Sequence, residues 1–269
     1  MPEVEQFVEV HGCRVRLARA GKGPTLLYLH GANGPNEWTR FFEELAGQFE
    51  VISPDHPGYG ASGDAPWMEN IGDLAYFYLD LIKTLGLSDV HLVGHSMGGW
   101  LAAEIAVRST HSLASVTMVA AAGLRVPGHN GVDIFMLPPA ELLGKHLYVD
   151  SKLAEAALAD LAKPKTPEQL DVLIRNRTTS AQLCWHPRLN NPQLARWLHR
   201  IDVPTHLIWG EGDHIIPPEH GRAYKKLMPG AKLSFIADAG HSVQVEKPRE
   251  MLAAMLTFYD EDQFRASRP

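Results

Sequence analysis

Short apolar runs alternate with helical patterns through the first part of the chain. The runs have the length and residue types of buried strands, whereas the stretches between them repeat apolar residues with helical spacing. The strand-like runs are VEQFVEV, CRVRLARA, PTLLYLHG, EVISPDH, DVHLVGHS and ASVTMVAAAG. The helical patterns cover residues 37–48, 71–85 and 97–108. This order predicts an α/β fold with a mostly parallel sheet covered on both faces, opened by an antiparallel pair of strands because no helix separates the first two runs.

The strand pattern stops after residue 123 and resumes after residue 200. The segment 124–200 has helical patterns that are broken by prolines, which do not continue a helix. These prolines are Pro138, Pro139, Pro164, Pro167, Pro187 and Pro192. The runs THLIWGEGD and KLSFIADAGH then precede helical patterns at 219–227 and 248–259. We therefore expect one α/β core formed by residues 1–123 and 201–269, with residues 124–200 as a helical insertion.

Composition narrows the class of protein. The 269 residues, 45% of them hydrophobic, suffice for one sizeable core, and the formal net charge of -6 provides no basic surface for nucleic acid. Cys13 and Cys184 fit neither a disulfide framework nor a metal-binding spacing, which indicates reduced thiols. The acidic start MPEVEQ lacks the features of a signal peptide, and no apolar run reaches membrane-spanning length. We therefore expect a cytoplasmic protein with no membrane or nucleic-acid partner; a homodimer is left open.

A nucleophile is predicted at Gly94-His95-Ser96-Met97-Gly98, which fits the pattern G-x-S-x-G. The letters alone are weak evidence, because a glycine-rich turn can match them by chance. Their place is more specific, since they follow an apolar strand and open a helix. A sharp turn there strains the middle residue and needs small residues two positions before and after it. The turn would hold the hydroxyl of Ser96 out at the edge of the sheet, beside the positive end of a helix.

A serine hydroxyl needs a base, and position selects one among the 14 histidines. In α/β sheets ligands lie beyond the carboxyl ends of the strands, and His241 follows the run KLSFIADAG at such an end. His30 and His95 also lie at strand ends. His30 is more plausibly part of its own loop, and His95 points away from its neighbour Ser96. We therefore predict His241 as the general base.

The base in turn needs an acid that fixes its tautomer. Asp213 ends the run HLIWGEGD, one strand-helix unit before His241, and the chain order Ser, Asp, His is the order expected for this architecture. The competing acids are Asp55, Asp202, Asp238 and Glu211. Asp202 precedes its strand, and Asp238 is too close in the chain to reach the far ring nitrogen. Asp213 is therefore the predicted acid, although an ordinary turn-forming aspartate after Gly212 is the alternative.

Acyl transfer also requires donors for an oxyanion. The small-residue loop His30-Gly31-Ala32-Asn33-Gly34 follows a strand and can present the N–H group of Ala32, while the turn after Ser96 presents that of Met97. The side chain of Asn33 is a further candidate. No zinc motif or cysteine pair occurs, and G-x-G-x-x-G is missing after the first strand, so neither a metal nor another cofactor is expected.

With these residues in hand, the chain resembles the α/β-hydrolase superfamily over nearly its whole length. Five motifs in the family's order carry the resemblance: LHG, DHPGYGAS, GHSMGG, WGEGD and GH, the last of which ends at His241. The resemblance implies a Ser96, Asp213 and His241 triad, oxyanion donors at Ala32 and Met97, and a helical lid at residues 124–200. Serine at position 96 argues against the epoxide hydrolase and haloalkane dehalogenase branches, which use aspartate there.

The branch within the family is less determined. The region of Ser96 and Trp185-His186-Pro187 is similar to meta-cleavage product hydrolases, which split carbon-carbon bonds, but His95 and Ser242 depart from their usual Asn and Trp. We predict hydrolysis of a small or medium apolar carboxylic ester. Carbon-carbon bond hydrolysis and lactone hydrolysis are the alternatives, and a ligand receptor with little turnover is the alternative of another class. Candidate substrate-binding residues are Asn33, Trp185, Arg175 and Arg177.

Overall fold

The protein is described by a computed structural model that covers residues 4–35 and 38–260. Its centre is an eight-stranded sheet with the order β1-β2-β4-β3-β5-β6-β7-β8. The strands are β1 (Val4–Val10), β2 (Cys13–Ala20), β3 (Thr25–Leu29), β4 (Glu50–Pro54), β5 (Val90–His95), β6 (Leu113–Val119), β7 (Thr205–Gly210) and β8 (Lys232–Ile236). β2 pairs antiparallel with both β1 and β4, and the remaining pairs are parallel. The predicted fold class and the antiparallel opening are thus confirmed.

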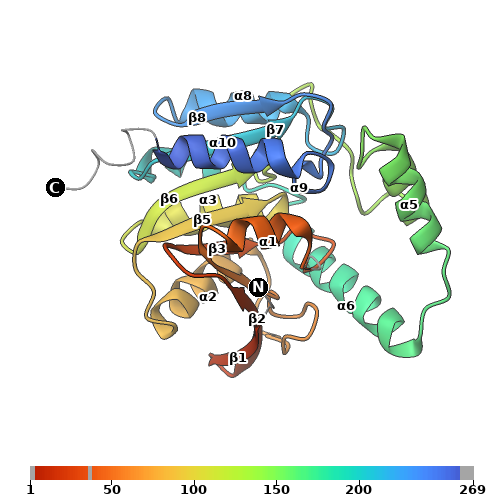
Figure 1. Ribbon diagram of the computed structural model, residues 1–269, viewed down its shortest axis with the longest axis horizontal. Helices are drawn as coiled ribbons and strands as arrows, with labels where there is room; N and C mark the ends of the chain where they lie inside the picture. Colours follow the sequence, from red (N-terminus) through yellow and green to blue (C-terminus); the bar gives the residue numbers. More distant parts are fainter. Residues whose placement is uncertain (1–3, 36–37, 261–269) are drawn as a thin grey trace.

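Helices cover both faces of the sheet, because the central strands β5, β6 and β7 bury apolar side chains on each side. One face packs against α1 (Arg40–Ala46) and α10 (Pro248–Asp260), where Phe42 and Met255 belong to one apolar cluster. The other face packs against α2 (Ile71–Thr84), α3 (Met97–Arg108) and α8 (Pro218–Leu227). Figure 1 shows α1 and α10 in front of the strands. The sheet is therefore a rigid platform whose strand ends can hold side chains in fixed positions.

The core elements follow the predicted ranges with few differences. α3 covers the predicted helix 97–108, and α10 extends the predicted 248–259 by one residue. α1 begins at Arg40 rather than near Glu37, a position that lies outside the described residues. Helix α9 (Val243–Glu246) is a single turn that the sequence pattern did not reveal. Short elements are missed because one turn contains too few residues to show a period.

Between β6 and β7 the chain forms helices α4 (Pro139–Lys145), α5 (Ser151–Leu161), α6 (Pro167–Cys184) and α7 (Leu194–Trp197), followed by the 3₁₀ turn η1 (Leu198–Arg200). We call residues 124–200 the inserted segment. Two of the predicted proline breaks mark helix starts, since Pro139 opens α4 and Pro167 opens α6. Thr166 caps α6 and forms a reciprocal pair of hydrogen bonds with Gln169. Figure 1 shows α5 and α6 standing apart from the layers of the core.

None of the helices in the described ranges 4–35 and 38–260 combines the length and the apolar character needed to cross a membrane.

Candidate active site

Ser96 occupies a strained turn between β5 and α3. Its φ of 57° and ψ of -116° lie outside the regions that non-glycine residues favour. The turn needs glycine on both sides. A Cβ atom at Gly94 would lie 2.1 Å from the carbonyl oxygen of Gly98, and one at Gly98 would lie 2.1 Å from that of Leu29. The backbone N–H of Ser96 donates to Val119 at 2.8 Å, which ties the strained residue to the neighbouring strand β6.

Three side chains from three strand ends meet at this turn. Ser96 follows β5, Asp213 follows β7 and His241 follows β8. The Oγ atom of Ser96 is 2.9 Å from Nε2 of His241, and Nδ1 of His241 is 2.9 Å from Oδ2 of Asp213. The structure therefore brings together the serine, histidine and aspartate that the sequence singled out, in the hydrogen-bonding order that a nucleophile, its base and an orienting acid require.

The carboxylate of Asp213 is fixed on both of its oxygens. Oδ1 accepts hydrogen bonds from the backbone N–H groups of Ile215 and Ile216, each at 2.9 Å, which leaves Oδ2 for His241. Asp213 is only 3% exposed, so its charge acts in a region of low polarisability. A carboxylate held in this way orients the imidazole and stabilises the positive charge that it gains as a base.

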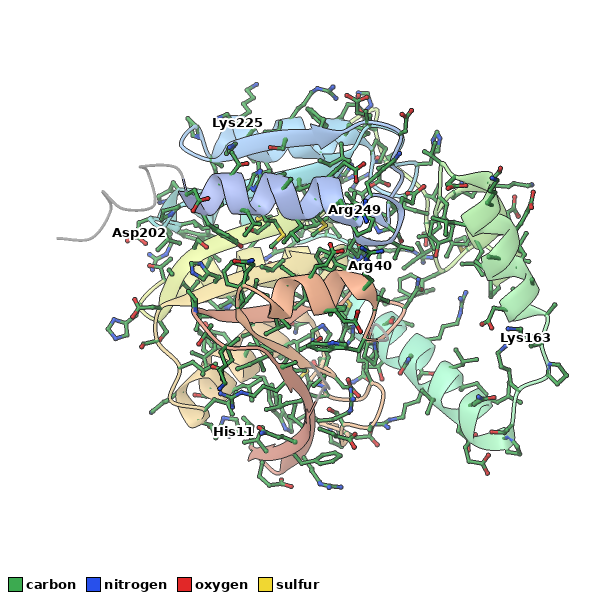
Figure 2. The ribbon with its side chains drawn as sticks, in the orientation of Figure 1. His11, Arg40, Lys163, Asp202, Lys225 and Arg249 are labelled. Atoms are coloured by element: carbon green, nitrogen blue, oxygen red, sulfur yellow. The ribbon has the colours of Figure 1, made fainter. Side chains whose placement is uncertain are left out.

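The competing acids lie elsewhere. Asp55 pairs with Nη1 of Arg16 at 3.2 Å and accepts from the N–H of Ala61. Asp202 accepts a hydrogen bond from Thr110, and Figure 2 shows it at the end of the molecule opposite Lys163. Asp238 and Glu211 are exposed. Asp213 is therefore the acid in contact with His241.

The other two strand-end histidines have supporting positions. His95 is buried, and its Nε2–H donates to the carbonyl oxygen of His241 at 2.9 Å. Gln244 lies 3.4 Å from the other ring nitrogen of His95. Burial lowers the pKa of His95 to about 3, with a smaller contribution from the nearby His241, so its ring is neutral near neutral pH. His95 thus holds the backbone of the loop that carries His241, a role that the sequence did not reveal.

His30 shapes the loop that follows β3. Its Nδ1–H donates to the carbonyl oxygen of Gly31 at 2.8 Å, and its Nε2 accepts from the backbone N–H of His56 at 3.0 Å. The His56 ring stacks on it at a centroid distance of 3.7 Å and bonds to the hydroxyl of Tyr78. Burial lowers the pKa of both rings, that of His56 to about 4. These neutral rings fix the loop that contains Gly31 and Ala32.

That loop lies beside Ser96. A Cβ atom on Gly31 would be 3.3 Å from Cβ of Ser96, a tight contact that glycine avoids. Ala32 and Met97, the two predicted oxyanion donors, both line the same cavity as Ser96. Met97 is the first residue of α3, and a first helical residue has no partner for its N–H within the helix. Both predicted donors therefore belong to residues that line the cavity together with Ser96.

A cavity of about 710 Å³ opens next to these groups. Ser96, His241 and Asn33 line it on the side of the core, and residues of the inserted segment supply more than half of the lining. The apolar part includes Leu142 and Leu147, while the polar part includes several side chains with hydrogen-bonding groups. The lining is therefore mixed in character rather than purely apolar, and its volume suits a small or medium molecule.

The predicted substrate-binding residues divide into two groups. Asn33 lines the cavity, whereas Trp185, Arg175 and Arg177 do not. Arg175 turns toward the core, where Nε contacts Asp64 at 3.0 Å and the Nη atoms donate to carbonyl oxygens of the loop after β4. Arg177 is exposed on α6. The structure thus separates both arginines from the cavity: Arg175 binds the core, and Arg177 faces solvent.

Further contacts attach the inserted segment to the site. The carboxylate of Glu246 in α9 accepts hydrogen bonds from the N–H groups of Val149, Asp150 and Gly240, the residue before His241. On the other side of the cavity Ser180 of α6 donates to the carbonyl oxygen of Ala32. These residues went unnoticed in the sequence, because a glutamate or serine on a helix carries no pattern that distinguishes such a contact from an ordinary surface position.

Within the described part of the chain, no three His, Cys, Asp or Glu residues group closely enough to hold a metal ion.

Comparisons with known proteins agree with the fold. A family model described as alpha/beta hydrolase fold matches residues 24–248. A membrane phospholipase A, known from its crystal structure, superposes with a TM-score of 0.78 at 23% identity and covers 98% of this chain and 87% of its own.

Two curated relatives are informative at the level of sequence. The dihydrolipoyllysine-residue acetyltransferase component of an acetoin cleaving system from Cupriavidus necator is 31% identical, over 93% of this chain and 67% of that protein. A 2-hydroxy-6-oxo-6-phenylhexa-2,4-dienoate hydrolase from Burkholderia cepacia is 27% identical, over 87% of this chain and 86% of its own length. These relatives have different named activities, so sequence similarity does not by itself indicate one reaction for this chain.

Proposed function

Because the chain belongs to the alpha/beta hydrolase fold family, we propose that it is a serine hydrolase that cleaves a carboxylic ester through an acyl-enzyme. One observation carries the proposal: Ser96, His241 and Asp213 form a continuous hydrogen-bonded line, with 2.9 Å at each step, on the wall of a cavity. A buried line of this kind prepares the serine hydroxyl to lose its proton when it attacks a carbonyl carbon.

The reaction follows from the positions of the groups. Oγ of Ser96 attacks the ester carbonyl carbon while Nε2 of His241 takes the hydroxyl proton, and Asp213 stabilises the imidazolium that results. The oxyanion accepts hydrogen bonds from the N–H groups of Ala32 and Met97. His241 then gives its proton to the leaving alkoxide, and the alcohol departs. Water, deprotonated by His241, attacks the acyl-enzyme and releases the acid and free Ser96.

The inserted segment acts in this proposal as a lid. Its contacts to the core lie on two sides of the cavity, through Glu246 near His241 and through Ser180 near Ala32. A segment fixed at these points covers the cavity and supplies most of the surface that a substrate meets. The core would then determine the reaction and the lid the choice of substrate.

Carbon-carbon bond hydrolysis is the second candidate. It is favoured by the similarity to the dienoate hydrolase from Burkholderia cepacia. Such a reaction requires the leaving carbon to be protonated before the acyl group is transferred, which demands support that an ester does not need. His95 stands before Ser96 and lines the cavity, but its Nε2–H donates to the carbonyl oxygen of His241 and its Nδ1 lies 3.4 Å from Gln244, so both ring nitrogens are engaged by the loop that carries His241 rather than left for a dienone. For this reason the ester is the preferred substrate in the proposal, and lactones, which are cyclic esters, fit the same site.

The proposal is tested by comparing kcat/KM for a short-chain aryl ester and for a meta-cleavage dienone with the wild-type chain and with Ser96→Ala. We expect the ester to be the better substrate and its turnover to depend on Ser96. A preference of about tenfold or more for the dienone would contradict ester hydrolysis as the function and support carbon-carbon bond hydrolysis. Saturable ester binding without turnover would instead indicate a ligand receptor.

A further inference from the structure

The stretch of the inserted segment between α4 and α5 lies against the loops that follow β7 and β8. The backbone N–H of His241 donates to the carbonyl oxygen of Leu147 at 3.1 Å. A Cβ atom on Gly240 would lie 2.9 Å from that same carbonyl oxygen and 3.1 Å from the backbone nitrogen of Val149. The two backbones approach each other so closely that a side chain at position 240 would force them apart.

Val149 makes a second contact between the same parts of the chain. A Cβ atom on Gly212 would lie 2.5 Å from Cγ2 of Val149, so the valine side chain occupies the space beside that glycine. Gly212 precedes Asp213, and Gly240 precedes His241. The last glycine of WGEGD and the glycine of GH thus mark the places where the inserted segment contacts the residues next to the acid and the base.

Glu246 of α9 links the inserted segment to the loop that carries His241. Its Oε1 accepts hydrogen bonds from the backbone N–H groups of Val149 and Asp150 at 2.7 and 3.0 Å, and its Oε2 accepts one from Gly240 at 2.5 Å. An ionised acceptor forms stronger hydrogen bonds with backbone N–H groups than a neutral one does. One carboxylate therefore binds the inserted segment through one oxygen and the loop of the base through the other.

The backbone of His241 is held from both parts of the chain. Its carbonyl oxygen accepts a hydrogen bond from Nε2–H of His95 in the core, whereas its N–H donates to Leu147 in the inserted segment. If residues 147–150 move away, that N–H loses its acceptor, and Glu246 loses two of its three donors. A displacement of about 1 Å in a catalytic group can lower a rate by about 100-fold. The position of this stretch therefore bears on the reaction.

We propose that Glu246 is a positioning residue that couples closure of the inserted segment to the placement of His241. The base reaches its productive position when residues 147–150 lie against the two glycine-containing loops, so acyl transfer takes place in a covered cavity. In an open arrangement His241 is displaced, and Ser96 reacts slowly. This inference rests on the proposed serine hydrolase function, and it gives the inserted segment a role beyond the choice of substrate.

The main test is Glu246→Gln, which keeps the size of the side chain. An amide has one acceptor oxygen, so its NH₂ group must face a backbone N–H on one of the two sides. The rate constant for labelling Ser96 with an aryl fluorophosphonate should fall by about 10- to 100-fold, and kcat for the neutral ester p-nitrophenyl pentanoate by a similar factor. KM should change by less than about threefold. The control Glu250→Gln, at an exposed position in α10, should match wild type.

A role of Glu246 in stability alone would give a different result. The unfolding free energy of Glu246→Gln, measured by urea titration, would then fall, while its labelling rate under conditions where the variant is fully folded would equal that of wild type. This result would overturn the inference. The amount of label at completion counts the folded active sites, so it separates a slower site from a smaller number of sites.

A second pair of variants tests the contact between the inserted segment and the core. Gly212→Ala places a methyl group against Val149 and should displace the inserted segment, which lowers the labelling rate by about tenfold. Adding Val149→Ala removes the clashing atom and should restore the rate to within about threefold of wild type. An unchanged rate in Gly212→Ala, or no recovery in the double variant, would overturn the inference. If the proposed ester hydrolysis fails instead, Ser96 would still be labelled and respond to Glu246→Gln, but the ester would not be turned over.

Discussion

The two sides of the cavity differ in how firmly they hold their side chains. On the core side, Ser96, Asp213 and His241 follow the parallel strands β5, β7 and β8, and each has backbone or side-chain partners at about 3 Å. On the opposite side, the inserted segment supplies the lining mostly from stretches outside its helices, such as residues 186–190 after α6. Figure 2 shows Lys163 at the outer end of this segment, where α5 and α6 extend beyond the core.

This difference indicates that the core and the inserted segment have separate roles. Groups that must act with sub-ångström geometry on a reacting bond lie on the rigid platform, whereas groups that recognise a substrate lie on a segment that a family can vary without disturbing the sheet. If this division holds, substitutions on the core side should affect every substrate alike. Substitutions in the inserted segment should affect some substrates only, or stability only.

The largest effect is expected for Ser96→Ala. It removes the atom that forms the acyl-enzyme, so kcat for any ester should fall by about 10⁴- to 10⁶-fold. Initial rates with a chromogenic ester at high enzyme concentration measure the loss. Ser242→Ala, a second serine in the lining of the same cavity, is the matched control and should stay within about tenfold of wild type. Comparable losses in both variants would contradict the assignment of the nucleophile.

The next largest effect is expected for Asp213→Asn. Its kcat should fall by about 10⁴-fold because the amide favours the wrong tautomer of His241. The comparison is Asp202→Asn, which changes an acid at the far end of the sheet and should leave kcat unchanged. Combining Asp213→Asn with His241→Ala should cost little more than His241→Ala alone, since the residues act as a unit. Additive losses in the double variant would point to a different acid.

The dependence of the unfolding free energy on pH below 6.5 tests the core without reference to any substrate. Burial lowers the pKa of five core histidines, and in a folded chain these rings stay neutral below pH 6.5 while the unfolded chain takes up protons. The five are His30, His56, His91, His95 and His206. Burial raises the pKa of Asp55, and this one group changes the unfolding free energy with pH in the opposite direction.

The unfolding free energy should therefore fall as the pH is lowered from 6.5 toward 4, by up to about 1.4 kcal/mol per pH unit for each ring. Urea titrations at a series of pH values measure this slope. His206→Phe should reduce this slope by the contribution of about one proton. His199→Phe, at an exposed position, should leave the slope unchanged. A flat profile between pH 6.5 and 4 would contradict the buried neutral rings.

The smallest effect is expected for Arg175→Ala. Its guanidinium joins α6 to the loop after β4 and does not reach the cavity. The variant should lose about 1–2 kcal/mol of unfolding free energy, while kcat/KM for the neutral ester changes by less than about threefold. Arg177→Ala should alter neither quantity. A tenfold loss of activity with unchanged stability in Arg175→Ala would place this arginine in the substrate site after all.

The core could be predicted from the sequence because its signals are local. A strand followed by Gly94, Ser96 and Gly98 and then by a helix specifies one turn, and α3 begins and ends where the pattern places it. The positions of Asp213 and His241 follow from the rule that parallel strands present their carboxyl ends at one edge. These inferences need only the order of elements and the residues at their ends.

The inserted segment could not be predicted to the same depth, because its contacts join residues far apart in the chain. Arg175 and Arg177 were equally plausible ligands on a polar helix, yet the first binds the core and the second faces solvent. Arg188, which does reach the cavity, lies in a proline-containing stretch with no periodic pattern. The attachment by Glu246 is likewise a tertiary contact with no local signal.

The most direct test of the central claim is to trap the covalent intermediate and locate it. Wild-type chain and Ser96→Ala are treated with an aryl fluorophosphonate, which reacts with a serine that a base has activated, and the adduct is measured by intact-mass and peptide mass spectrometry. The account predicts one adduct per chain, on Ser96, formed quickly in wild type and much more slowly in His241→Ala. An adduct on another residue, or ester turnover that continues undiminished after Ser96 is replaced, would contradict it.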